Sequence, residues 1–519
     1  MSTDDDSKDD PSTPLLRGHN SRRAKERRKF PFLRARILAI IVPTFVGSAL
    51  SSRESLMAQY LVARIGGDRN VTHKHVNPCH SDTNSSAVRE ANDVQAEAAD
   101  LLSHYALIQV IPAFFACLVF GSYSDFLGRR VLLLVPIFTT LVKVILTSLI
   151  IGYHLSLNYF YLAYGVDGLS GSWFTILIAI YSLTADINAK EKSRTLSIFA
   201  MMCISSVTQA GVSIAMSDLI DSLGFFDASL LITAISAVAF LLPLVSLPET
   251  LHCHQLEITN SIPPSQEYEN EISHNPKPDL PEAASKSTAQ KWINPAHQLH
   301  RIFGFYISYG TIRHRLEMVI LMLIFMFPAA NEINLSAIDA LYQLNRPFCW
   351  GPREIGYYSA IRSGGSNVVG GIWMAILQKC LPFEALGLLG VLAQAVGLGF
   401  EGLIKISWQF YLVPAILAPA VGISAIVRGM MSIKARPDQQ GALFSSIAVM
   451  ECLTTLASTT SYNKVYSATV DLSMPGAVYL LMAACALTAV ILYLLYFVIR
   501  EKPDLTTVAE IAPSIQENG

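Results

Sequence analysis

The sequence predicts an all-α polytopic membrane protein with twelve transmembrane helices in two six-helix halves. Of its 519 residues, 52% are hydrophobic and 15% are charged, and the mean hydropathy is +0.40. Soluble proteins carry about 25% charged residues, so this composition excludes an ordinary soluble enzyme and a disordered chain. The apolar residues fall in blocks of about twenty, the length of a helix that crosses a hydrocarbon core. The longest polar stretch separates six of these blocks from the other six.

The first half, 36–247, follows a polar N-terminal tail at 1–35. Its six apolar segments lie at 36–63, 102–122, 131–152, 157–182, 195–217 and 228–247. A long polar loop at 64–101 separates the first two segments. Because the tail is highly charged and the first segment is long, we expect a signal anchor and no cleaved signal peptide.

The second half, 316–499, follows a polar linker at 248–315 and precedes a polar C-terminal tail at 500–519. Its six apolar segments lie at 316–343, 353–380, 383–404, 409–432, 441–464 and 476–499. The linker is poor in large apolar residues. Near its end, however, the residues around Ile302 and Phe305 favour a short helix along the membrane surface.

Basic residues predict the orientation of the spans. Most of the 38 Lys and Arg residues lie in segments that are cytoplasmic if the N-terminus is cytoplasmic. This bias predicts that both termini are cytoplasmic. The loop 64–101 is then outside, where sequons at Asn70 and Asn84 are candidates for glycosylation. Only Cys79 and Cys349 of the eight cysteines fall in outer loops, so we expect either a disulfide between them or two unpaired thiols.

A glycine-rich and basic string follows the second span. Gly121 permits close helix approach, Gly128 permits a tight turn, and Asp125 can pair with an arginine or with helix-end amides. Arg129 and Arg130 fit the positive-inside rule. The string resembles the loop signature G-x-x-x-D-x-x-G-R-R of the major facilitator superfamily, and the resemblance implies the major facilitator fold.

Further strings resemble the solute carrier family of the proton-coupled folate transporter and the thymic stromal cotransporter. They include Leu101-Leu102-Ser103-His104-Tyr105, Ile355-Gly356-Tyr357, Val427-Arg428 and Gln440-Gly441-Ala442-Leu443-Phe444-Ser445. The resemblance implies a disulfide between Cys79 and Cys349, and a role for Arg428 in substrate and proton handling. Two positions depart from the folate-transporting branch. Met202 stands where that branch has a coupling glutamate, and Glu332 stands where it has a functional histidine.

Several ionisable residues lie within the predicted spans: Arg53, Glu54, Asp167, Glu332, Asp339, Arg362, Arg428 and Glu451. Each would cost about 2.5–3.5 kcal/mol if it faced lipid, so they must line an aqueous cavity or pair with one another. We expect Glu332 or Asp167 to take up a coupled proton. We expect Arg362, Arg428 and Arg53 to hold an anionic solute. The alternative is a structural ion-pair network of Arg53, Glu54, Glu332 and Arg362.

These features predict a secondary active transporter that moves a small organic solute, anionic and folate-like, by alternating access with proton symport. The alternatives are a proton-independent facilitator or antiporter, an endolysosomal exporter of another solute such as a muropeptide, and a non-transporting receptor. No catalytic motif is found, and neither a cofactor nor a metal is expected, with H⁺ as the coupling ion. The basic run at 22–29 is explained by topology and anionic lipid and not by nucleic acid. We expect a monomer or weak homo-oligomer in the plasma membrane or an endolysosomal membrane.

The disulfide hypothesis predicts how the two halves migrate on a gel. If a protease cuts the linker at 248–315, the halves stay joined without reductant and separate with it, because Cys79–Cys349 connects them. The measurement is gel electrophoresis of the nicked protein, with Cys349→Ser as the control. Separation of the halves without reductant would exclude this bridge.

Overall fold

The structure is a computed structural model that describes residues 13–69, 86–127, 129–187, 191–246, 295–435, 440–470 and 474–500. At several helix ends only the backbone is described, among them 13–37, 121–127, 181–187 and 191–202. Gly128, Asn70, Asn84 and Cys79 lie outside the described residues. The predicted glycosylation and the pairing of Cys79 therefore stay predictions. Cys349 itself takes part in a disulfide.

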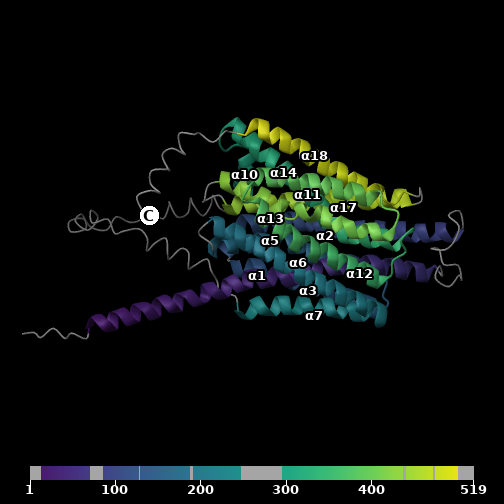
Figure 1. The fold of residues 1–519 in the computed structure, drawn as a ribbon. Coiled ribbons are helices and arrows are strands. Elements are labelled where there is room, and N and C mark those ends of the chain that lie inside the picture. Colours follow the sequence, from purple (N-terminus) through teal and green to yellow (C-terminus); the bar gives the residue numbers. More distant parts are fainter. Residues whose placement is uncertain are drawn as a thin grey trace, which may run out of the picture.

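All regular secondary structure in the described residues is helical, and the long helices lie side by side (Figure 1). The first-half helices are α1 (Thr13–Asp68), α2 (Ser86–Leu127), α3 (Arg129–Gly152), α4 (Tyr159–Leu169), α5 (Ser172–Ile187), α6 (Glu191–Ser222) and α7 (Phe225–Ser246). The later helices are α10 (Pro295–Ile307), α11 (Ile312–Leu344), α12 (Pro352–Ala360), η2 (Ile361–Gly365), α13 (Ser366–Leu377), α14 (Phe383–Gly402), η3 (Ser407–Leu412), α15 (Val413–Leu417), η4 (Ala418–Ala420), α16 (Ile423–Lys434), α17 (Gln440–Val470) and α18 (Ala477–Ile499).

Ten helical stretches among the described residues are long and apolar enough to cross a membrane. They correspond to ten of the twelve predicted spans and confirm a polytopic all-α membrane protein. The two other predicted spans correspond to α1, which carries Arg53 and Glu54 in its described part, and to the consecutive short helices α12, η2 and α13.

Three predicted spans are not single α-helices. Between α4 and α5 the chain turns at Gly171, whose φ of +83° strains any residue with a Cβ atom. The span at 353–380 contains the π-helical segment η2, and the span at 409–432 is divided into η3, α15, η4 and α16. Gly422, with a φ of +102°, begins the last of these pieces. Broken helices of this kind mark solute sites in transporters, because irregular backbone inside a membrane is tolerated where it lines a cavity.

Helices of the predicted first and second halves pack directly on each other. α2 packs against α17, and α6 packs against α12, η2 and α13. Cys117 of α2 and Cys452 of α17 have sulfur atoms 3.7 Å apart. Both hydrophobic clusters of the core combine residues from α1–α7 with residues from α11–α18. The contact between the two sets of helices therefore extends along the bundle.

The helix predicted near the end of the linker is present as α10. Its Ile302 and Phe305 are buried, and Phe305 joins the same cluster as α11 and α17. The hydroxyl groups of Tyr306 and Ser446, on α17, lie 2.9 Å apart. α10 thus packs on the bundle through one apolar face.

Close packing of α12 on α6 depends on Gly356. A Cβ atom at this position would lie 1.6 Å from the hydroxyl oxygen of Ser217 and 2.9 Å from the backbone oxygen of Ser213. We expect Gly356→Ala to lower the free energy of unfolding by about 1–3 kcal/mol, because the two helices must separate. The thermal unfolding midpoint of the detergent-purified protein measures this effect. The control is Gly211→Ala on α6, where nothing lies within 4 Å, and an equal loss in both variants would contradict the packing argument.

Candidate central transport cavity

A cavity of about 590 Å³ lies between the two halves. Its lining residues come from α1, α2, α4, α5 and α6 on one side and from α11 to α17 on the other. Six of the eight predicted site residues line it: Glu54, Glu332, Asp339, Arg362, Arg428 and Glu451. Arg53 and Asp167 are buried and are not among the residues that line the cavity. The six that line it are all of the charged residues among the described lining residues.

The N-terminal charge cluster consists of Arg53, Glu54, Lys143 and Asp167. Arg53 is paired with Glu54 and donates a 2.7 Å hydrogen bond to the hydroxyl oxygen of Tyr164. Lys143 Nζ lies 2.5 Å from Asp167 Oδ2, and both side chains are fully buried. The two bases and two acids of this cluster balance each other.

Asp167 is held by hydrogen-bond donors as well as by its ion pair. The hydroxyls of Ser172 and Thr140 donate to its carboxylate at 2.6 and 2.8 Å, and the amide of Gln109 donates at 3.0 Å. A carboxylate with an ion pair and three donors has its charge satisfied without a proton. These contacts favour a structural role for Asp167 over the predicted role as the proton site.

The C-terminal charge cluster consists of Glu332, Asp339, Arg362, Glu401, Arg428 and Glu451. Arg362 donates to both carboxylate oxygens of Glu401, with Nη2 at 2.9 Å from Oε2. Its Nη1 also lies 3.2 Å from Asp339 Oδ2. The hydroxyl of Tyr479 donates to Asp339 Oδ1 at 2.7 Å. One guanidinium thus serves two carboxylates, of which only Asp339 lines the cavity.

The second cation of this cluster, Arg428, is paired with Glu451 and lies over the ring of Phe325, 4.9 Å from its centroid. Glu332 is exposed to the cavity and accepts a 3.1 Å hydrogen bond from the hydroxyl of Ser424. Among the described residues, no cation lies within salt-bridge distance of Glu332. The C-terminal cluster therefore holds four acids and two bases.

The predicted alternative, one ion-pair network of Arg53, Glu54, Glu332 and Arg362, is not formed by the described residues. Arg53 pairs with Glu54 inside the first half, and Arg362 pairs with Glu401 and Asp339 inside the second. The charges are separated into two clusters that face a common cavity.

Curated relatives of the chain are transporters, although no family model matches it. The lysosomal proton-coupled steroid conjugate and bile acid symporter SLC46A3 of Gallus gallus is 23% identical over 366 residues, 70% of this chain and 72% of that protein. The proton-coupled folate transporter of Bos taurus is 22% identical over 442 residues, 84% of this chain and 86% of that protein. Both transporters are homologues of this chain.

Solved structures of transporters share the fold of this chain. The human organic anion transporter MFSD10 matches 89% of this chain and 99% of its own, with a TM-score of 0.53 and 14% identity. The proton:xylose symporter XylE matches 89% of this chain and 95% of its own, with a TM-score of 0.56 and 12% identity. The predicted major facilitator fold is confirmed.

Two charged residues of the clusters, Glu401 and Lys143, were not among the residues that the sequence analysis predicted for the site. Glu401 lies near the end of the predicted span 383–404, where a charge reads as a boundary residue. Lys143 reads as a single base whose side chain can reach the membrane surface. The signal that could have found both residues is an opposite charge on another span, Arg362 for Glu401 and Asp167 for Lys143. Such partners have no fixed separation in sequence.

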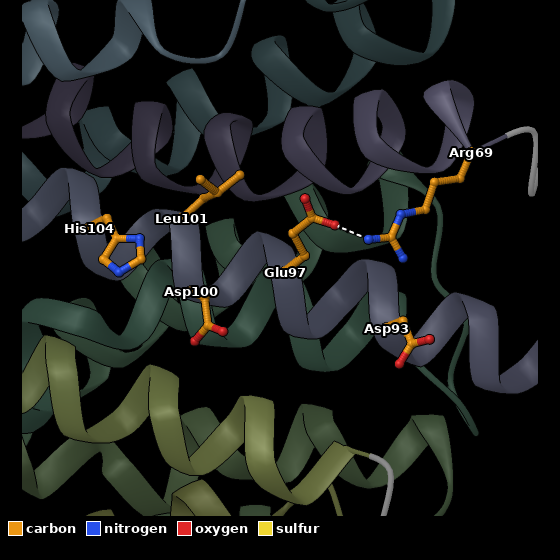
Figure 2. A pocket seen from close by; sticks show the side chains of 6 residues that line it. All are labelled: Arg69, Asp93, Glu97, Asp100, Leu101 and His104. Carbon is orange, nitrogen blue, oxygen red and sulfur yellow. Dashed lines mark hydrogen bonds and ion pairs between the residues drawn. The ribbon is translucent and has the colours of Figure 1, made fainter.

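A second hollow, of about 460 Å³, lies at the C-terminal end of α1 and on the N-terminal half of α2 and is drawn in Figure 2. It is lined by Arg69, Asp93, Glu97, Asp100, Leu101 and His104, and Arg69 is paired with Glu97. It shares no lining residue with the central cavity. Its carboxylates therefore serve as controls for those of the cavity.

The predicted latch after the second span is described in part. α2 ends at Leu127 and α3 begins at Arg129, while the side chains of Gly121, Asp125, Arg129 and Met202 lie outside the described residues. Arg130 donates a 2.7 Å hydrogen bond to the backbone oxygen of Leu244 near the end of α7. Arg130 thus binds a carbonyl group at a helix C-terminus, which a cation stabilises.

We expect Asp167→Asn to destabilise the protein by about 3–5 kcal/mol, because it leaves the Lys143 ammonium buried without a counter-charge. Lys143→Met combined with Asp167→Asn is expected to recover most of that loss, because both charges are then absent. Thermal unfolding and folded yield in detergent measure both effects. If the single variant is as stable as the unsubstituted protein, the structural role of Asp167 is wrong.

Proposed function

We propose that this protein is a proton-coupled secondary transporter that carries a small organic solute through the central cavity by alternating access. The observation that carries the proposal is the charge imbalance of the C-terminal cluster, with four carboxylates for two guanidiniums. Burying an uncompensated carboxylate costs several kcal/mol. Such a group lowers that cost by binding a proton, and embedded carboxylates commonly carry protons in transporters.

The proton site that the contacts favour is Asp339. Arg362 balances one negative charge, and Glu401 already receives both arms of the guanidinium. Glu401 is fully buried, whereas Asp339 lines the cavity and is accessible to a proton from it. A proton on Asp339 leaves one carboxylate for one guanidinium, so the trio becomes neutral.

Protonation of Asp339 would also change how the helices are held together. Asp339 lies on α11, Arg362 on η2 and Glu401 on α14. With Asp339 charged, Arg362 ties α11 to η2; with Asp339 neutral, Glu401 holds Arg362 against α14 alone. One turn before Asp339, the hydroxyl of Ser336 lies 3.2 Å from that of Ser51 on α1. The proton site is therefore close to a contact between the two halves, which alternating access must remake.

The names of the relatives support proton coupling, but they do not specify one membrane for this chain. Their names include a lysosomal proton-coupled symporter and a proton-coupled folate transporter. We place this chain in the plasma membrane or an endolysosomal membrane, with both termini in the cytoplasm and the acidic compartment on the opposite side. Facilitated transport without protons, or a receptor without transport, leaves the excess carboxylates of the cavity without a function.

Asp339→Asn is expected to abolish the stimulation of solute uptake by an acidic outside medium, because an amide cannot take up the coupled proton. Exchange of solute at equal pH on both sides should continue. The measurement is the uptake of folates, steroid conjugates and organic amines into proteoliposomes. The matched control is Asp100→Asn, in the second hollow (Figure 2).

If uptake by Glu332→Gln no longer responds to pH while uptake by Asp339→Asn still does, the proton site is Glu332 and not Asp339. Uptake by the unsubstituted protein that does not respond to pH would contradict proton coupling altogether.

A further inference from the structure

Both cations that line the cavity are already bound to carboxylates. Among the described lining residues, Arg362 and Arg428 are the only bases. Arg362 is paired with Glu401 and Asp339, and Arg428 with Glu451. An anionic solute would have to compete with these carboxylates for the guanidiniums. The arrangement therefore disfavours the anionic solute that the sequence suggested.

The carboxylate of Glu332, unlike the two arginines, takes part in none of the ion pairs of the described residues. It is exposed to the cavity, and its described polar contact is the 3.1 Å hydrogen bond from Ser424. An exposed carboxylate in an enclosed site attracts a cation strongly, because the low dielectric around it weakens screening.

Buried amide oxygens around the cavity also lack hydrogen-bond donors. Gln394 donates its amide N–H to the backbone oxygen of Pro328 at 3.4 Å, which leaves its Oε1 without a partner among the described residues. Oδ1 of Asn463 and both polar atoms of Gln343 are likewise unpaired. All three side chains line the cavity and are at most 5% exposed. Buried polar atoms are normally paired, so the three amide oxygens favour a solute that brings hydrogen-bond donors such as N–H groups, and Nε2 of Gln343 can donate to an acceptor of the solute.

Aromatic side chains complete the lining. Tyr164, Trp173, Phe174 and Tyr358 face the cavity. The ring faces of Tyr164 and Tyr358 already meet Arg53, Lys143 and Arg362. Trp173 and Phe174 therefore supply the apolar contact for the body of a solute, and an aromatic face that attracts a positively charged nitrogen.

We infer that the cavity binds solutes through a protonated amine that pairs with the Glu332 carboxylate. The inference rests on the proposed function, because it takes the central cavity as the transport site. It assigns recognition and proton coupling to different carboxylates of α11. Glu332 and Asp339 are seven residues apart, so they share a face of the helix and lie roughly 10 Å apart along it.

The test uses three probes of similar shape and different charge: phenethylamine, phenethyl alcohol and phenylacetate. Binding to the full-length purified protein is followed by the shift of its thermal unfolding midpoint with probe concentration at neutral pH. We expect the amine to bind about tenfold more tightly than the alcohol, because a charge-assisted hydrogen bond replaces a neutral one. Phenylacetate should bind no better than the alcohol.

Glu332→Gln is expected to remove the preference for the amine, and Glu332→Asp, which keeps the charge, to retain most of it. Glu97→Gln, in the second hollow (Figure 2), should leave the preference for the amine unchanged. The inference is overturned if phenylacetate binds best, if the unsubstituted protein does not distinguish the three probes, or if Glu332→Gln keeps the preference. The comparison of probes on the unsubstituted protein decides the matter even if a variant does not fold.

Asp339→Asn separates this inference from the proposed function. It should keep the amine preference in the binding assay while it loses the pH effect on uptake. Amine binding without any pH effect on uptake would refute proton coupling alone, whereas pH-dependent uptake of anions only would refute amine recognition alone.

Discussion

The low dielectric of the membrane interior decides how this structure is arranged. An unpaired ionised group there costs several kcal/mol, so each buried charge must find a counter-charge, a proton or an aqueous cavity. The trio of Arg362, Glu401 and Asp339 combines the counter-charge and the cavity in one place, and the proton proposed for Asp339 would add the third solution. Glu401 has its counter-charge and is fully buried. Asp339 shares that counter-charge and faces the cavity, where protons are available.

The backbone around the cavity meets the same constraint. A helix that satisfies its own hydrogen bonds is stable in lipid, whereas a broken one needs polar partners or water. The breaks at Gly171 and Gly422 bring Ser172 and Gly422 itself to the cavity lining. Ser172 then donates to Asp167, so the broken helix also helps to hold a buried charge. Irregular backbone and buried charge thus occur together, because both need the polar surroundings that the cavity supplies.

Sequence predicted the ten spans that the described residues contain and their order, because an apolar block of about twenty residues is a local property of the chain. It also predicted six of the cavity-lining charges, since a charge inside an apolar block must face something other than lipid. It did not predict which charges pair. Lys143 meets Asp167 and Arg362 meets Glu401 across different helices, and helix packing sets these contacts at no fixed sequence separation. The role expected for Asp167 depended on that pairing, so the sequence alone favoured a proton site where the contacts favour a structural ion pair.

The two charge clusters differ in a way that suits alternating access. In the N-terminal cluster, two acids balance two bases, and Asp167 has three further donors, so its charge state does not need to change during transport. In the C-terminal cluster, the acids outnumber the bases, and its net charge depends on protons and on any cation in the cavity. A protonated amine on Glu332 and a proton on Asp339 would together cancel the excess without breaking either arginine pair. Because moving an uncompensated charge through a closed intermediate is costly, the solute and the proton would each lower the cost for the same conformational step. Symport would then follow from charge balance and would not require direct contact between solute and proton.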